Sequence, residues 1–120
     1  MDKKKILNLQ NEFEIVFNDL EKNFLSQNKP ENRHDRAFFN YVKRETDPLF
    51  EKLDQWYNQS MQVVENKKEG KLYPTQIEKT KENIELLILH SYYIDVPKKR
   101  YKELKNSIEY IFQQLRQILS

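Results

Sequence analysis

Side chains suited to acid–base catalysis or metal binding are scarce in this sequence. The 120 residues include two histidines, His34 and His90, and no cysteine. A carboxylate-bridged metal pair in a helical bundle needs Glu-x-x-His on two helices, and here that spacing occurs only from Glu31 to His34, beside Pro30. Chance spacing in a connecting segment explains it better. We therefore expect neither a bound metal nor a cofactor.

A serine activated by a histidine is not expected either. Ser91 follows His90 directly, but neighbouring residues on a helix point about 100° apart, so the two side chains do not form a catalytic pair. We expect His90 to be partly buried and hydrogen-bonded. Without an acid–base toolkit, we expect no enzymatic activity.

Aromatic and basic side chains gather around Pro97. The candidate binding residues are Tyr92, Tyr93, Lys98, Lys99, Arg100, Tyr101 and Lys102. Cations in the first turn of a helix oppose its dipole, so helix stability does not explain them. Aromatic rings among cations can stack on nucleobases or pack against an anionic partner. In the simpler interpretation, Tyr101 lies in the core and the lysines are solvated.

The elements that position these residues are helices. One glycine, Gly70, and four prolines, at positions 30, 48, 74 and 97, are few breaks for a β or α/β chain. Apolar residues recur three or four apart, which is the helical period. We predict long helices over about residues 4–28, 48–66, 75–94 and 97–119, and at Asp47 and Pro48 we expect a new or sharply kinked helix to start. Thr75 and Glu78 are predicted to form a capping box, and Gly70 to end the preceding helix.

Each predicted helix carries one apolar stripe. The stripes are Ile6, Leu9, Phe13, Val16, Phe17, Leu20 and Phe24; Phe50, Leu53, Trp56, Tyr57, Met61 and Val64; Ile77, Ile84, Leu87, Ile88 and Ser91; and Tyr101, Leu104, Ile108, Ile111, Phe112, Leu115, Ile118 and Leu119. We expect one domain over residues 1–120, an all-α up-down four-helix bundle with an additional short helical segment, about 33–45, between the first and second long helices. Phe38, Phe39 and Trp56 are expected in the core.

This topology sorts residues to the two ends of the bundle. The end that holds Pro97 also collects the segment from Pro30 to Pro48, which could add to the binding cluster Arg33, Arg36, Tyr41, Lys43 and Arg44. The opposite end collects both termini and Gly70.

The charge of the whole chain excludes little. The net charge of +2 makes no global case for nucleic acid or an anionic membrane. Residues 97–120, with six basic and two acidic side chains, carry the excess of positive charge. No stretch approaches the ~20 apolar residues of a membrane span. The lack of cysteine fits a reducing compartment, so we expect a cytoplasmic protein.

Residues spread over most of the chain resemble a known family. They are Phe38, Phe39, Trp56, Tyr73, Gln76, Ile77, Glu78, Lys81, Asn83, Leu87, Leu89, Ser91, Tyr92 and residues 98–102. They resemble the YppE-like family of small bacterial helical proteins of unknown function, over roughly residues 34–119. The resemblance implies an all-α bundle in a bacterial cytoplasm and transfers no activity.

Two functions from different classes remain open at this point. The first is a non-catalytic module that binds an unidentified protein partner through the basic and aromatic cluster. The second is a nucleic-acid-associated protein that binds phosphates through the same residues, which steep salt dependence would reveal. The oligomeric state is left open.

Overall fold

Four helices form along the apolar stripes of the sequence. The computed structural model describes residues 3–26, 35–66, 72–93 and 96–119. Its helices are α1 (Lys3–Leu25), α2 (Arg36–Asn66), α3 (Pro74–Tyr92) and α4 (Lys98–Leu119). The described ranges contain no strand, so the predicted all-α bundle is confirmed.

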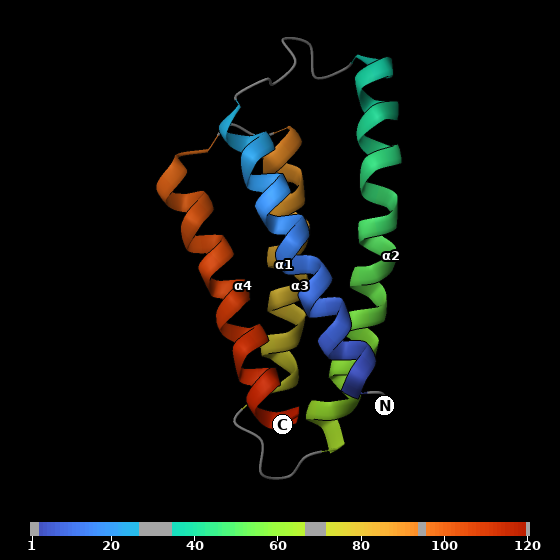
Figure 1. Ribbon diagram of the computed structural model, residues 1–120, viewed down its shortest axis with the longest axis vertical. Helices are drawn as coiled ribbons and strands as arrows, with labels where there is room; N and C mark the ends of the chain where they lie inside the picture. Colours follow the sequence, from blue (N-terminus) through green and yellow to red (C-terminus); the bar gives the residue numbers. More distant parts are fainter. Residues whose placement is uncertain (1–2, 27–34, 67–71, 94–95, 120) are drawn as a thin grey trace.

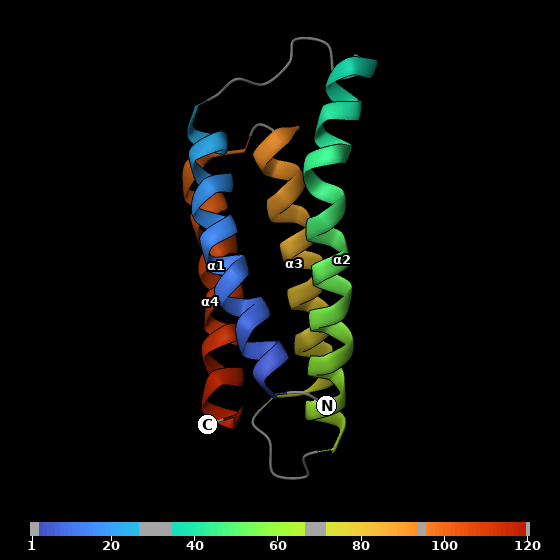
Figure 2. The same cartoon turned by 45° about the vertical axis from the view of Figure 1, so that its right-hand side comes forward.

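Successive helices run in opposite directions, which is the predicted up-down arrangement (Figure 1). Helix α3 packs against all three others, and α1 also packs against α2 and α4. Figure 2 shows α1 beside α4 and α3 beside α2, with α2 and α4 on opposite sides of the bundle. We call the end of the molecule at the top of Figure 1 the upper pole; there α1 and α3 end and α2 and α4 begin.

The segment before Pro48 is not a separate helix, so this part of the prediction is wrong. Helix α2 runs without a break through Pro48. A proline inside a helix removes one hydrogen bond and crowds the carbonyl four residues earlier. Packing offsets this cost, because Val42, Thr46 and Leu53 are buried on one stripe that passes the proline, while Pro48 itself is exposed. The Asp-Pro pair is a local signal for a helix start, but burial of the apolar stripe on both sides of Pro48 keeps the helix continuous.

The start of α3 also differs slightly from the prediction. The helix begins at Pro74 rather than Thr75, because proline has no N–H to satisfy and its φ already suits the first helical position. The Gln76 side chain, not Glu78, closes the cap: its Oε1 accepts the Tyr73 backbone N–H at 2.9 Å. The predicted cap at Gly70 lies outside the described residues.

The core contains most of the predicted stripe residues, although on α2 Phe50, Tyr57 and Met61 are half-buried and pack against the core from its edge. From α1 all but Val16 are buried, and the predicted stripe of α3 is buried completely. Phe13, Phe17, Phe112 and Trp56 form an aromatic centre in which neighbouring rings lie 5.4–6.4 Å apart. This centre joins α1, α2 and α4, and all four side chains are at most 1% exposed, so their burial stabilises the fold.

One polar side chain lies inside this aromatic centre. Gln10 is fully buried, at 0% exposure. Its Oε1 accepts the indole N–H of Trp56 at 3.0 Å, and its Nε2 donates to the Phe112 carbonyl at 3.1 Å. The Gln10 node therefore connects three helices and satisfies the indole, which would otherwise be an unpaired buried donor.

A second polar node lies nearer the upper pole. The Ser91 hydroxyl donates to the Leu87 carbonyl at 2.7 Å and lies 2.7 Å from the Tyr101 hydroxyl. Because Ser91 has one hydroxyl proton, Tyr101 donates to Ser91. The Asn23 amide donates to the Ser91 carbonyl. The Ser91 node thus connects α1, α3 and α4.

Candidate functional site

The four predicted cations at the start of α4 are all exposed. Lys98, Lys99, Arg100 and Lys102 form no ion pair with a carboxylate in the described ranges. With about 100° between successive residues, Lys98, Lys99 and Lys102 lie within about 100° of one another around α4, while Arg100 points to another side. The three lysines therefore share one side of the first turns, and Arg100 is separate from them.

Tyr101 is buried, so it is not available to a partner in this structure. It is 1% exposed and its ring stacks on Phe24, with the ring centroids 4.1 Å apart and the planes 9° from parallel. Its hydroxyl is part of the Ser91 node. The assignment of Tyr101 as a binding residue is corrected: its place on the apolar stripe of α4 takes it into the core.

The burial of Tyr101 predicts a loss of stability at alkaline pH. Burial raises the pKa of Tyr101 to about 12. The hydrogen bond with Ser91 lowers this pKa, and the nearby Glu21 and Tyr92 raise it by smaller amounts. The unfolded chain releases this proton near pH 10, so the stabilisation is complete below pH 10 and is lost as the pH rises through 12. We expect a loss of about 2 kcal/mol.

Urea unfolding at several pH values from 9 to 12 measures this loss. The variant Tyr101→Phe has no hydroxyl to titrate, so its free energy of unfolding should fall less steeply over the same range. Equal slopes for the two proteins would contradict the assignment of the alkaline loss to Tyr101.

Tyr92 and Tyr93 are half-buried and contact the start of α2. Phe38 meets Tyr93 edge-on with the centroids 5.5 Å apart, and Tyr41 meets Tyr92 edge-on at 6.4 Å. Phe38 and Tyr41 also lie 6.3 Å apart. Burial first, then the Tyr41 hydroxyl and the Glu45 carboxylate, raises the pKa of Tyr92, so that its hydroxyl stays protonated. We call these four residues the aromatic cluster.

Two aromatic side chains on the first turns of α2 are exposed. Phe39 is 54% exposed and Tyr41 42% exposed. The expectation that Phe38 and Phe39 lie in the core is therefore wrong. Phe38 is half-buried in the aromatic cluster and Phe39 is exposed, because the first turns of α2 extend beyond the ends of α1 and α3 (Figures 1 and 2). Trp56, by contrast, is buried as predicted.

The structure separates two groups that the sequence places together. The aromatic cluster lies where α2 meets α3, whereas the cations belong to α4, on the opposite side of the bundle from α2. Among the described residues, no cation of the first turns of α4 lies over an aromatic ring. A cation–π contact occurs elsewhere, between α3 and α2, where Lys81 lies over the Tyr57 ring at 4.7 Å from its centroid. Arg36, Lys43 and Arg44 lie on α2, where Lys43 pairs with Asp47 at 2.8 Å. Arg33 lies outside the described residues.

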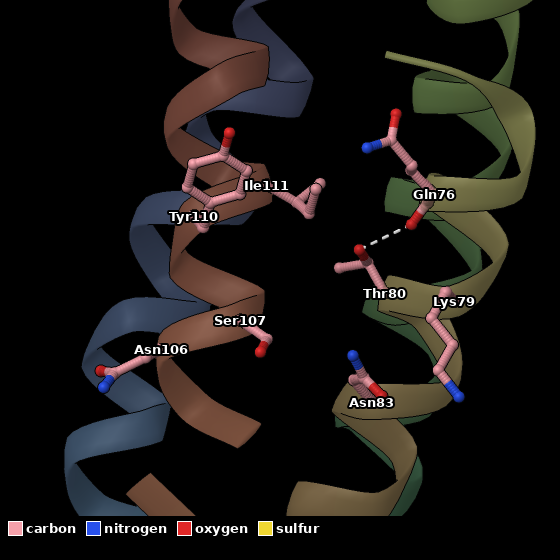
Figure 3. Close-up of a pocket in the computed structure, with 8 residues that line it drawn as sticks. All are labelled: Gln76, Lys79, Thr80, Asn83, Asn106, Ser107, Tyr110 and Ile111. Atoms are coloured by element: carbon pink, nitrogen blue, oxygen red, sulfur yellow. Dashed lines mark hydrogen bonds between the residues drawn. The ribbon is translucent and has the colours of Figure 1, made fainter. Parts of the chain in front are cut away.

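A groove along the outer side of α3 and α4 was not predicted. Its wider part has a volume of about 600 Å³. It is lined by Gln76, Lys79, Thr80, Asn83, Asn106, Ser107, Tyr110 and Ile111 (Figure 3). A narrower hollow of about 290 Å³ shares Lys79, Asn83 and Ser107 and continues to His90 and Arg100. We call the two together the α3–α4 groove.

A comparison with protein families places the chain. A family model for a bacterial domain of unknown function, DUF1798, matches residues 10–119. The chain belongs to this family. The match confirms the YppE-like resemblance and extends it into α1, so that the DUF1798 region contains the Gln10 node, the Ser91 node, the aromatic cluster and the groove. Neither the curated proteins nor the solved structures contain a significant match.

The remaining chemistry of this DUF1798 chain concerns its histidines. Glu31 and His34 lie outside the described residues. His90 is buried near the upper pole. The hydroxyl of the adjacent Ser91 is hydrogen-bonded to the Leu87 carbonyl and the Tyr101 hydroxyl. Within the described ranges, no three His, Asp or Glu side chains come close enough to share a metal ion. In the same ranges, no helix has the length and apolar character needed to cross a membrane.

Proposed function

We propose that this DUF1798 protein is a non-catalytic module of the bacterial cytoplasm that binds a partner protein at the upper pole. The observation that carries the proposal is the exposure of Phe39 and Tyr41 on the first turns of α2, where Tyr41 belongs to the aromatic cluster. Large exposed aromatic side chains are costly in water and are enriched at protein interfaces. The absence of cysteine from the sequence fits a reducing compartment.

The cations of α4 suit a partner segment that carries acidic side chains. Exposed charges of one sign raise association rates more than they raise affinity. We therefore assign the contact itself to the aromatic rings and the attraction of the partner to Lys98, Lys99 and Lys102. Nucleic acid is the less favoured ligand. Single-strand binding uses aromatic rings and cations along one continuous path, whereas here the rings lie on α2 and α3 and the cations on α4.

Affinity capture from a bacterial lysate, with the bound proteins identified by mass spectrometry, tests this proposal. Phe39→Ser is expected to reduce recovery of a specific partner at least tenfold, because serine cannot replace the apolar contact that the Phe39 ring would make with the partner. Ile15→Ser is the matched control, since Ile15 is also an exposed apolar side chain, at 66%, but lies on α1. Its recovery should equal that of wild type.

The charge contribution is tested in the same experiment. Lys98→Glu/Lys99→Glu should slow capture, whereas Lys3→Glu/Lys4→Glu, which reverses two exposed cations in the first turn of α1, should not. A partner retained equally by Phe39→Ser and by wild type would refute the aromatic contact. Recovery that disappears after nuclease treatment would favour nucleic acid instead.

A further inference from the structure

The narrower hollow of the α3–α4 groove is lined by charges of both signs. Arg100 and Glu103 line it from α4, and Lys79 lines it from α3. Lys79 pairs with Glu82 at 3.7 Å, which offsets its charge. In the part of the chain that the structure describes, neither the Arg100 guanidinium nor the Glu103 carboxylate forms an ion pair or a hydrogen bond. The hollow therefore retains one unpaired cation and one unpaired carboxylate.

The order of these two residues along α4 is the less favourable one for an ion pair between them. Side chains three residues apart on a helix have Cβ atoms about 5–6 Å apart, so a contact is within reach. A carboxylate that precedes a cation pairs better than one that follows it, because the helix dipole then favours both charges. In α4 the cation comes first. A ligand that carries both charges can thus contact Arg100 and Glu103 without breaking an existing pair.

Charge complementarity selects the class of ligand. An anion would be attracted by Arg100 and repelled by Glu103, and a cation would be attracted and repelled in the reverse order. A zwitterion is attracted by both, since a carboxylate accepts two hydrogen bonds from a guanidinium and an ammonium donates to a carboxylate. A free α-amino acid carries these two groups on one carbon atom, close enough together to meet neighbouring side chains of one helix face.

The size of the hollow fits one amino acid. Its volume is about 290 Å³, and from Arg100 to Ser107 α4 rises about 10 Å. Leu86 of α3 and Leu104 of α4 lie between the charged end and the opposite end, which Asn83 and Ser107 form. Figure 3 shows Asn83 and Ser107 pointing toward the gap between the two helices. A ligand with its charged groups at Arg100 and Glu103 therefore places its side chain on two leucines and ends it at polar groups.

The Asn83 carboxamide indicates how that side chain ends. Asn83 is half-buried, and its side chain forms no hydrogen bond with any described residue. An apolar group placed against it would remove water without supplying a partner, which is costly. A carboxamide on the ligand can donate to and accept from Asn83, and it can donate to Ser107, whose own proton goes to the Glu103 carbonyl at 3.0 Å.

We infer that the narrower hollow binds a free α-amino acid whose side chain has a short apolar stem and a terminal carboxamide, as in glutamine. The ligand carboxylate pairs with Arg100 and the ligand ammonium with Glu103. The methylene groups pack between Leu86 and Leu104, and the carboxamide bonds to Asn83. This site is separate from the aromatic cluster and does not depend on the proposed function.

L-Glutamine is the probe, titrated into the labelled wild-type chain and followed by backbone amide shifts and by calorimetry. We expect saturable shifts along residues 83–90 and 100–107. N-acetyl-L-glutamine lacks the ammonium group, as the last residue of a peptide does, and L-glutaminamide lacks the carboxylate, as the first residue does. Each should bind about tenfold more weakly than L-glutamine, and L-leucine, which lacks the carboxamide, should also bind more weakly.

Variants of the charged residues assign the two ends of the ligand. Arg100→Gln and Glu103→Gln should each weaken L-glutamine about tenfold. The matched controls Arg44→Gln and Glu65→Gln make the same changes at exposed positions of α2 and should stay within about twofold. Glu103→Gln should not weaken N-acetyl-L-glutamine, because that compound has no ammonium group to pair.

A change at Asn83 tests the contact with the ligand side chain. Asn83→Leu should weaken L-glutamine about tenfold and leave L-leucine unchanged, a change of preference that poor folding of the variant would not produce. The control Asn58→Leu makes the same substitution at an exposed position of α2 and should alter neither ligand.

Three results would overturn the inference. They are no saturable shift with up to about 10 mM L-glutamine, shifts confined to residues outside the hollow, and binding of either blocked derivative as tightly as L-glutamine, which would indicate a chain terminus as the ligand. The first two are measured on the wild-type chain, so the folding of a variant does not affect them. Phe39→Ser should bind L-glutamine as the wild type does, which keeps failure at the hollow distinguishable from failure at the aromatic cluster.

Discussion

Leu115→Ala is expected to lower the free energy of unfolding by about 2–5 kcal/mol. Leu115 and Ile108 are completely buried on α4. Removing their side chains loses transfer free energy and leaves a cavity that close-packed helices fill only in part. Ile108→Ala should therefore show a loss of the same size.

Urea unfolding curves measure both losses, and Gln113→Ala is the control. Gln113 lies on the same helix between two buried positions but is exposed, so its change should stay within about 0.5 kcal/mol. Similar losses for Gln113→Ala and Leu115→Ala would mean that a different face of α4 meets the core.

Gln10→Leu is expected to destabilise the protein by about 2–4 kcal/mol although leucine is the more apolar side chain. The variant leaves the indole N–H of Trp56 buried without its acceptor. The Phe112 carbonyl loses the hydrogen bond from the Gln10 amide but remains within the backbone hydrogen bonding of α4. Most of the cost therefore arises at the Trp56 indole.

A double-mutant cycle identifies the source of this loss. Gln10→Leu should cost less when Trp56→Phe is already present, because no indole N–H then remains unpaired. Gln113→Leu makes the same substitution on the surface and should change the free energy of unfolding by less than about 0.5 kcal/mol. Additive effects in the cycle would show that the Gln10 hydrogen bond does not account for the loss.

Sequence patterns predicted the helices and most of the core, because the helical period reports which face meets other helices. They failed where a local signal opposed a longer one. At Pro48 the Asp-Pro pair indicated a helix start, yet the buried stripe through Val42 and Leu53 continues the helix. Gln10 was missed for a related reason, since a polar residue between Leu9 and Phe13 is assigned to the surface until the Trp56 indole is placed against it.

The candidate site was predicted less well than the fold. Residue types located the exposed lysines of α4 but placed Tyr101 among them, although its stripe position takes it into the core. The groove escaped notice because it depends on which residues of α3 face which residues of α4. The small side chains at Thr80, Asn83 and Ser107 were the available signal for a groove. They indicate one only when it is known that these positions of α3 and α4 face each other.

The two polar nodes also limit how the four helices can be aligned. A bundle of leucine, isoleucine and phenylalanine stripes keeps much of its apolar contact when one helix slides by a turn, about 5.4 Å, along its neighbour. Such a slide of α1 would pull Gln10 away from both Trp56 and Phe112, and Asn23 away from the Ser91 carbonyl. Each shifted alignment would bury unpaired polar atoms, so hydrogen bonds at two heights of α1 discriminate against alternative packings that apolar contact alone would tolerate.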